Sequence, residues 1–365
     1  MALRGARERT IHAMVATAPG KLELREFPRP AIGPDEAILR VQACGICGTD
    51  IAQFQGKLTR YPFIPGHEPV GVIDEIGEQA AARWRVGPGD RVAIEGLLAC
   101  GSCINCLAGA RTACLAAFSY GFTPLSRPPA VWGAYADYLY LHPRTVLHRI
   151  SERLPAALAV MFNPIGAGVR WASRLPATRL GDSMAILGAG QRGLACLIVA
   201  KAVGAWPIIV TDVARAAHKL ELARELGADY VITADRENSL ARVAELTGNQ
   251  GVDIVLDVNS DIRTVAAAVE MAKPGGTVVL AGAKPGEIPG LVADRLVLRS
   301  INLRGTFTVD TPSYREAVRL LEANAARFER LHTASYPMER AAEALHHLAG
   351  SGDRLPAIHL ALECN

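Results

Sequence analysis

Four of the eight cysteines in this 365-residue sequence are crowded into a stretch of 15 residues. They form a C-x2-C-x2-C-x7-C array that consists of Cys100, Cys103, Cys106 and Cys114. Four thiolates on one short loop can complete a tetrahedral shell around a zinc ion and leave no position for a substrate. The array therefore predicts a structural zinc site. The alternatives are an iron–sulfur cluster and four unrelated buried cysteines.

The composition is typical of a globular protein, because half of the residues are apolar and 21% are charged. The net charge of +3 is too small to indicate nucleic acid or an anionic membrane as a partner. No apolar run reaches the roughly 20 residues of a membrane-spanning helix, and the first dozen residues lack the apolar segment of a signal peptide. We therefore expect a cytoplasmic protein. In a reducing compartment a chain of this length does not need disulfides, so clustered cysteines indicate metal binding.

The first 155 residues are rich in glycine, proline and short strand-like runs. Three of these runs cover residues 37–44, 70–76 and 90–95, and turn signals such as Val86-Gly-Pro-Gly89 separate them. Short strands joined by irregular loops predict a compact β-rich domain over residues 1–155.

The pattern changes near Leu154, after which apolar strands alternate with helical stretches rich in alanine and leucine. We expect strands at 184–187, 207–211, 253–258 and 277–281, and helices at 193–203 and 215–226. This alternation predicts βαβ units and a doubly wound parallel α/β sheet over residues 156–303. A third segment, 304–365, contains two amphipathic helices, 312–326 and 337–349, and a final strand near 357–362.

A Gly-x-Gly-x-x-Gly motif follows the strand at 184–187 and opens the next helix. Its residues are Gly188, Ala189, Gly190, Gln191, Arg192 and Gly193. The first glycine permits a tight turn, the second lets the backbone approach a pyrophosphate, and the third lets helix and strand pack closely. Glycines end many strands, so the motif alone is weak evidence for a dinucleotide site.

The context of the motif strengthens the prediction. Asp212 ends the next strand, 24 residues after Gly188, where a carboxylate can bind the adenosine ribose and repel a 2′-phosphate. We therefore expect NAD in preference to NADP, although Arg215 could soften that preference and Asp212 could instead cap the following helix. Val258 and Gly282 lie at the carboxyl ends of later strands of the sheet, outside which the nicotinamide should bind.

A second set of metal-binding side chains occurs in two short segments, Cys47-Gly-Thr49-Asp50 and Gly66-His67-Glu68. Cysteine, histidine and glutamate can together hold a zinc ion with an open coordination position, as Lewis-acid catalysis requires. Taken alone, His67 would more often be an ordinary loop histidine and Cys47 a buried thiol.

At these residues the sequence resembles a known family. Gly66-His67-Glu68-x2-Gly71-x5-Gly77-x2-Ala80 is similar to the zinc signature of the medium-chain alcohol dehydrogenase family. The four-cysteine loop, the Gly87-Pro-Gly89-Asp90-Arg-Val run and the glycine-rich turn also occur in that family's order and spacing. The resemblance covers nearly the whole chain from Ala13 onward and is close to the sorbitol, threonine and related polyol or secondary-alcohol branch.

The resemblance implies a GroES-like catalytic domain, made from the N-terminal part and the C-terminal segment, with a Rossmann domain inserted between them. It implies that Cys47 and His67 bind a catalytic zinc, with Glu68 as a direct or exchangeable ligand. Thr49 would pass on the alcohol proton, and Asp50 would orient His67. The implied enzyme contains one catalytic and one structural zinc, uses NAD on a small alcohol or carbonyl substrate, and forms a homotetramer or dimer.

Two positions depart from the family pattern. Asn163 stands where the family usually supplies a further cysteine or glutamate near the zinc, and a neutral amide binds zinc more weakly than a carboxylate. Ala52 stands where many members carry a histidine that relays the proton. These departures leave open an NAD-binding protein with weak or absent catalysis. A zinc-independent reductase of activated double bonds is disfavoured, because that branch generally lacks both zinc motifs.

Overall fold

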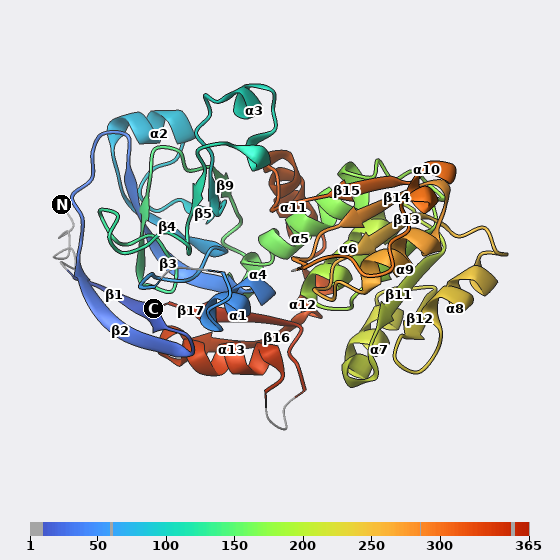
Figure 1. The fold of residues 1–365 in the computed structure, drawn as a ribbon. Helices are drawn as coiled ribbons and strands as arrows, with labels where there is room; N and C mark the ends of the chain where they lie inside the picture. Colours follow the sequence, from blue (N-terminus) through green and yellow to red (C-terminus); the bar gives the residue numbers. More distant parts are fainter. Residues whose placement is uncertain (1–9, 59–60, 285, 352–354, 365) are drawn as a thin grey trace. The chain divides into compact units, whose positions relative to one another are not determined.

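The computed structural model describes residues 10–58, 61–284, 286–351 and 355–364, and Figure 1 traces the chain through them. The chain divides into two compact units: Met1–Asn163 together with Val318–Asn365, and Pro164–Ala317. The second unit is inserted into the sequence of the first. Its boundaries fall within helices α5 (Phe162–Gly168) and α11 (Thr311–Ala323), whereas the sequence predicts breaks at 155/156 and 303/304.

A seven-stranded sheet forms the centre of the first unit. Its strands follow the order β16-β17-β3-β4-β5-β9, and β8 also pairs with β3. Their bounds are β3 (Ala37–Ile46), β4 (Pro69–Ile76), β5 (Arg91–Ile94), β8 (Tyr138–Leu141), β9 (Leu147–Arg149), β16 (His332–Pro337) and β17 (His359–Glu363). Strand β3 is buried over most of its length, because it lies in the middle of the sheet, and this explains its nearly continuous apolar sequence.

Shorter elements surround this sheet. Strands β1 (Thr10–Ala18) and β2 (Lys21–Pro28) form an antiparallel pair, as do β6 (Leu97–Leu98) and β7 (Phe118–Ser119). The helices of this unit are α1 (Gly48–Phe54), α2 (Glu78–Trp84), α3 (Ile104–Leu107), η1 (Arg111–Ala113), α4 (Ala156–Ala159), α12 (Ala325–Glu329), η4 (Met338–Arg340) and α13 (Ala341–Ala349). Mostly antiparallel strands with short helices confirm the β-rich character predicted for the N-terminal part.

The second unit contains a six-stranded parallel sheet in the order β12-β11-β10-β13-β14-β15. Its strands are β10 (Met184–Leu187), β11 (Ile208–Asp212), β12 (Tyr230–Thr233), β13 (Val252–Asp257), β14 (Ala272–Leu280) and β15 (Asn302–Gly305). Numbered along the chain, this is the order 3-2-1-4-5-6, so the direction of winding reverses between β10 and β13. The doubly wound parallel α/β sheet is confirmed.

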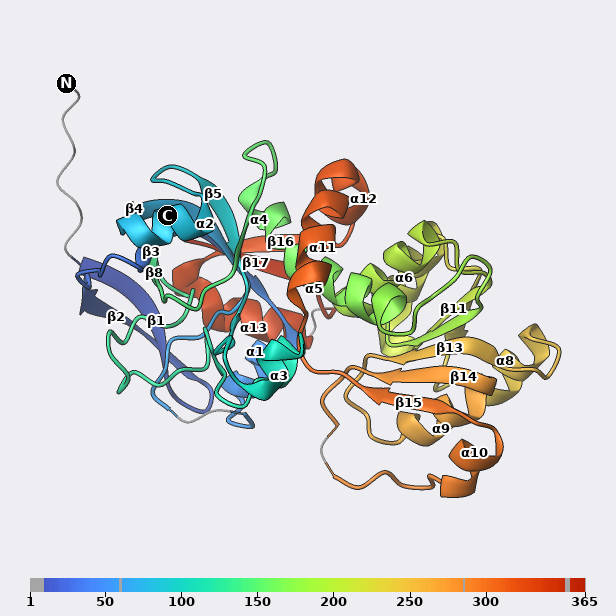
Figure 2. The same ribbon diagram turned by 90° about the horizontal axis from the view of Figure 1, so that it is seen from above.

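Helices cover both faces of the parallel sheet, as Figure 2 shows for α6 on one face and α9 on the other. They are the π-helical η2 (Val169–Arg174), α6 (Gln191–Ala202), η3 (Ala214–Ala216), α7 (Ala217–Glu225), α8 (Ser239–Leu246), α9 (Thr264–Met271) and α10 (Ala293–Leu298). Helix α6 is apolar almost all round and buried along most of its length, because it packs against β10 and β11 on one side and η2 on another.

None of the helices in the described part of the chain combines the length and the apolar character needed to cross a membrane.

Candidate metal centres and nucleotide site

Cys47 and His67 are brought together by the pairing of β3 with β4. Cys47 follows β3, and His67 lies just before β4; because the strands are antiparallel, with Cys44 opposite Pro69, these two ends meet. The distance from Cys47 Sγ to His67 Nε2 is 3.4 Å. Two ligands of one tetrahedral zinc, with Zn–S of about 2.3 Å and Zn–N of about 2.0 Å, would lie about 3.5 Å apart. The pair therefore fits a shared zinc ion.

Asp50 holds this arrangement from the first turn of α1. Its Oδ2 accepts a hydrogen bond of 2.9 Å from the amide of Cys47, and its Oδ1 lies 3.4 Å from His67 Nδ1. Burial alone would lower the pKa of His67, but the charges of Asp50 and Cys47 outweigh it and raise that pKa well above its ordinary value. A carboxylate on Nδ1 turns Nε2 toward Cys47, which is how outer carboxylates orient metal-binding histidines.

Glu68 is fully buried, with its Oε1 3.9 Å from His67 Nε2. Gly45 leaves room for this carboxylate, since a Cβ at position 45 would lie 2.6 Å from Glu68 Oε2. The amide of Thr49 donates to Cys47 Sγ over 3.4 Å, and Asn163 belongs to the same unit and is 3% exposed. The structure thus gathers Cys47, Thr49, Asp50, His67 and Glu68. The roles of these residues and of Asn163 in catalysis stay predictions.

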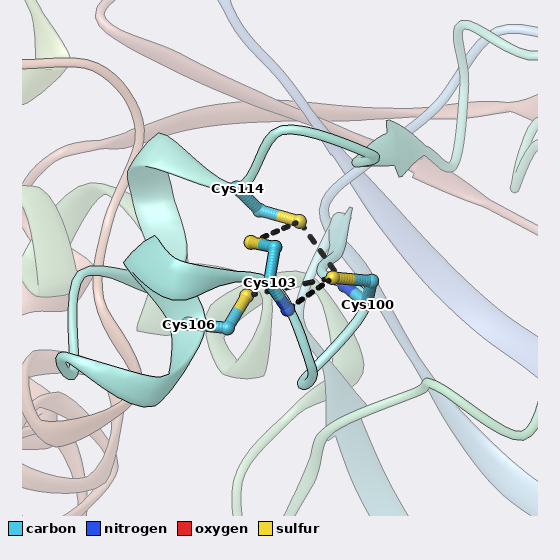
Figure 3. A group of neighbouring side chains, drawn as sticks. All are labelled: Cys100, Cys103, Cys106 and Cys114. Atoms are coloured by element: carbon cyan, nitrogen blue, oxygen red, sulfur yellow. Dashed lines mark hydrogen bonds between the residues drawn. The ribbon is translucent and has the colours of Figure 1, made fainter.

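The four cysteines of the C-x2-C-x2-C-x7-C array also converge, as Figure 3 shows. One ligand atom from each lies within 4.8 Å of all the others, and the sulfurs of Cys100–Cys106 and Cys103–Cys114 are each 3.9 Å apart. Sulfurs bound to one tetrahedral zinc would be separated by about 3.8 Å. A cluster of several metal ions would hold them further apart, so the geometry favours a single ion. The four are half-buried, so they are not merely core residues.

The backbone around this loop favours thiolates at two of its positions. Amide N–H groups of Ser102 and Cys103 point at Cys100 and lower its pKa to about 5, and those of Leu115 and Cys106 lower the pKa of Cys103. Desolvation and the neighbouring sulfurs raise the pKa of Cys106 to about 12. Four thiolates at such distances require a cation to offset their repulsion, so the donor set fits a divalent metal.

The glycine-rich turn of the second unit joins β10 to α6. Gly188 has a φ of +114°, which favours glycine, and Gly190 caps α6. A Cβ on Gly193 would lie 1.8 Å from the carbonyl oxygen of Gly188, so no other residue fits there. Gln191 and Arg192 occupy the first two positions of α6, and the guanidinium of Arg192 lies over the ring of Trp171 at 5.3 Å.

Asp212 ends β11 and contacts the same turn. Its carboxylate accepts hydrogen bonds from the amides of Ala189, at 2.7 Å, and Val213, at 2.8 Å. Val258 packs near Gly188, and a Cβ on Gly282 would lie 1.9 Å from the carbonyl oxygen of Asn259. All these residues lie at the carboxyl ends of parallel strands, where dinucleotides bind. Their contacts with a cofactor stay predictions.

Two residues at this edge were not identified from the sequence. Asp257 is the last residue of β13 and is fully buried, and the ammonium of Lys284 lies 2.9 Å from its Oδ1. A carboxylate directly after the apolar run Ile254–Leu256 was a usable signal for Asp257. No local pattern marked Lys284, which is 27 residues away.

Family models match both parts of the chain. Residues 33–152 match the alcohol dehydrogenase GroES-like domain, and residues 192–323 match the zinc-binding dehydrogenase family. The chain is 40% identical over 357 residues to a probable alcohol dehydrogenase of Mycobacterium tuberculosis, with 96% of this chain and 97% of that protein covered. It is 31% identical to the L-threonine 3-dehydrogenase of Anaeromyxobacter dehalogenans, with 77% and 79% covered.

Solved structures agree with this relationship. Alcohol dehydrogenase TADH from Thermus sp. ATN1 superposes with a TM-score of 0.84 at 28% identity, covering 96% of this chain and 99% of that one. A putative zinc-binding dehydrogenase from Sinorhizobium meliloti, solved with NADP bound, gives a TM-score of 0.86 at 25% identity and covers 98% and 100%. The chain therefore belongs to the zinc-dependent medium-chain alcohol dehydrogenase family, in its threonine and sorbitol dehydrogenase-like branch, and is a nicotinamide-dependent alcohol oxidoreductase.

Proposed function

We propose that this enzyme is an NAD-preferring dehydrogenase that interconverts a secondary alcohol or polyol with its carbonyl product. The observation that supports this most directly is the 3.4 Å approach of Cys47 Sγ to His67 Nε2, with Asp50 on the other ring nitrogen. Cysteine and histidine from separate segments, beside a buried glutamate, form the donor set of an open catalytic zinc site.

In this proposal Cys47, His67 and Glu68 hold the catalytic zinc, and the four-cysteine loop holds a structural one. Zinc at the first site supplies Lewis-acid polarisation of the substrate oxygen and lowers the pKa of the alcohol. The Thr49 hydroxyl accepts the alcohol proton, and Asp50 keeps His67 in the orientation that binds metal. Asn163 is too weak a ligand to replace a carboxylate, so we expect it to bind a water molecule at the site.

The preference for NAD rests on Asp212, whose carboxylate lies beside the glycine-rich turn. A carboxylate there would accept hydrogen bonds from the adenosine ribose and repel a 2′-phosphate. Arg215, three residues later and exposed, would reduce that repulsion. The similar Sinorhizobium meliloti structure contains NADP, so both cofactors belong in any assay.

Gly193→Ala should weaken NADH binding by about 10- to 100-fold, because the new methyl group would overlap the backbone of Gly188 and force the turn apart at a cost of about 1–3 kcal/mol. Isothermal titration calorimetry with NADH measures the effect. Gly305→Ala is the matched control, since a Cβ there meets no atom within 4 Å, and its affinity should equal that of the unmodified protein. If Gly193→Ala bound NADH as tightly as Gly305→Ala does, the proposed position of the cofactor site would be contradicted.

A panel of secondary alcohols, polyols and aldehydes, each assayed with NAD and with NADP, tests the proposed activity. Zinc should be measured on the same preparation. We expect turnover that is faster with NAD, in a protein with about two zinc ions per chain. One zinc per chain, and no turnover of any substrate in the panel, would refute the catalytic site.

The same proposal places the enzyme in the cytoplasm as a homotetramer or dimer. Five of the eight cysteines are proposed zinc ligands, and cysteines that bind metal instead of forming disulfides are typical of a reducing compartment. Size-exclusion chromatography with light scattering measures the oligomeric state.

A further inference from the structure

A buried ion pair lies at the carboxyl end of β13 and takes no part in the proposed chemistry. Asp257 is fully buried and the side chain of Lys284 is 6% exposed, with Nζ 2.9 Å from Asp257 Oδ1. Burial raises the pKa of Asp257, although hydrogen bonds from Thr264 and Lys284 oppose that shift. The Thr264 hydroxyl donates to Oδ2 over 2.7 Å. Both carboxylate oxygens of Asp257 therefore have donors.

The ammonium of Lys284 also holds the loop that follows β13. It donates to the carbonyl oxygen of Asn259 over 2.7 Å and lies 3.4 Å from that of Asp261. With the bond to Asp257, these contacts account for the three N–H groups of the ammonium. Lys284 thus joins the segment after β14 to the last residue of β13 and to two carbonyl oxygens of the loop that follows it.

This loop is in direct contact with the glycine-rich turn. The side-chain amide of Asn259 donates to Asp257 Oδ1 over 2.9 Å and to the carbonyl of Leu187 over 3.3 Å, and Leu187 immediately precedes Gly188. A Cβ on Gly188 would approach Asn259 to 3.4 Å. Moving the loop would therefore move atoms that border the proposed cofactor site.

The position in the sheet indicates which half of the cofactor is affected. Dinucleotides lie across the point where the strand order reverses, with one mononucleotide over each half of the sheet. Asp212 ends β11 in one half and is the expected partner of the adenosine ribose. Asp257 ends β13 and Lys284 follows β14, both in the other half, which leaves the nicotinamide mononucleotide for their side.

We propose that Lys284 is a positioning residue for the nicotinamide half of the cofactor: by tying Asp257 to the carbonyls of the 258–261 loop, it sets the edge of the crevice on which that half binds. This inference rests on the proposed dinucleotide function. A purely structural ion pair is the competing explanation. Buried pairs can often be replaced by apolar side chains without loss of stability, so the stability of the fold does not by itself require a lysine at this position.

The test compares two variants of the full-length protein by calorimetric titration with NADH and, separately, with AMP. Lys284→Met should weaken NADH binding about tenfold or more, the equivalent of one to two lost hydrogen bonds, and leave AMP binding unchanged. AMP contains only the half of the cofactor that lies near Asp212. General damage to the fold would weaken both ligands together.

Lys273→Met is the matched control. Lys273 pairs with Asp253 at the opposite, amino end of β13, so its loss removes a more exposed ion pair far along the same strand from the proposed site. Both ligands should bind this variant as they bind the unmodified protein. If Lys284→Met is too unstable to purify, Asp257→Asn combined with Lys284→Gln avoids an uncompensated buried charge and should show the same selective loss of NADH affinity.

Unchanged NADH affinity in the Lys284 variants, or a parallel loss of NADH and AMP affinity, would overturn the positioning role. So would an equal loss in Lys273→Met. If the unmodified protein binds neither NADH nor AMP, the proposed function fails instead, and the two failures are therefore distinct.

Discussion

Cys47→Ala should lower kcat/KM for the alcohol by at least about 10³-fold, because Lewis-acid activation contributes several kcal/mol and each 1.36 kcal/mol is tenfold in rate. The sulfur of Cys47 is one of the two atoms that face each other across the proposed catalytic site, at 3.4 Å. Without it, His67 and Glu68 would have to hold the ion alone. Steady-state kinetics and zinc analysis of the same preparation measure both consequences, and the zinc content should fall from about two ions per chain to about one.

Three comparisons make this prediction specific. NADH should bind Cys47→Ala normally, because the glycine-rich turn belongs to the other unit. Cys44→Ser lies three residues earlier, on β3, and is equally buried. It should retain most of the activity, since Cys44 is not a proposed zinc ligand and its Sγ donates to the carbonyl oxygen of Gly45 over 3.5 Å. Thr49→Ala should lose turnover but keep both zinc ions. Full activity in Cys47→Ala would remove the basis for the catalytic zinc.

Cys103→Ala should unfold the four-cysteine lobe, residues 99–118, and the protein should lose one zinc ion. A protease should then cleave within this lobe at least about a hundredfold faster than in the unmodified protein. The lobe has little apolar core of its own, because Ile104, Leu107 and Leu115 are 71%, 72% and 73% exposed. Only two short helical turns, α3 and η1, provide regular structure between Cys100 and Cys114. Metal–thiolate bonds are therefore the main interactions that would keep the lobe folded.

Timed proteolysis followed by mass spectrometry locates the cleavage, and metal analysis counts the lost ion. Ala110→Ser, at an exposed position of the same lobe, provides the control and should be cleaved at the original rate. Thermal unfolding of the parallel-sheet unit should be little affected, because it has its own core. A Cys103→Ala protein that keeps two zinc ions and resists the protease would show that this loop is not a metal site.

Local sequence patterns identified the elements whose conformation is constrained by their own residues. Residues 184–187 were predicted as a strand and are β10, and the helix predicted from 193 begins at Gln191 as α6. The C-x2-C-x2-C-x7-C spacing placed four sulfurs close enough for one metal, and Gly193 was predicted as a close-packing glycine before its neighbour was known. In each case residues that interact are near one another in the chain, so spacing and residue type carry the information.

Strands β15 and β16 show where such patterns are insufficient. β15 is a largely exposed edge strand, and β16 is mostly polar and only partly buried. Neither presents the apolar run that marks a buried strand, and each is formed by pairing with a neighbour, β14 or β17. The unit boundaries within α5 and α11 escaped detection for a similar reason, since a continuous helix carries no break in its sequence.

Residue type and local spacing in the sequence were therefore sufficient to identify the two metal motifs and the glycine-rich turn. They were also sufficient to predict the alternation of strands and helices that produces a doubly wound sheet. Tertiary structure alone decided that Asp50 faces the far nitrogen of His67, that Gly45 makes room for Glu68, and that Lys284 reaches Asp257. The physical reason is that spacing along the chain reports contacts within a loop, a turn or a helix. Contacts between distant segments depend on which strands pair and in what register.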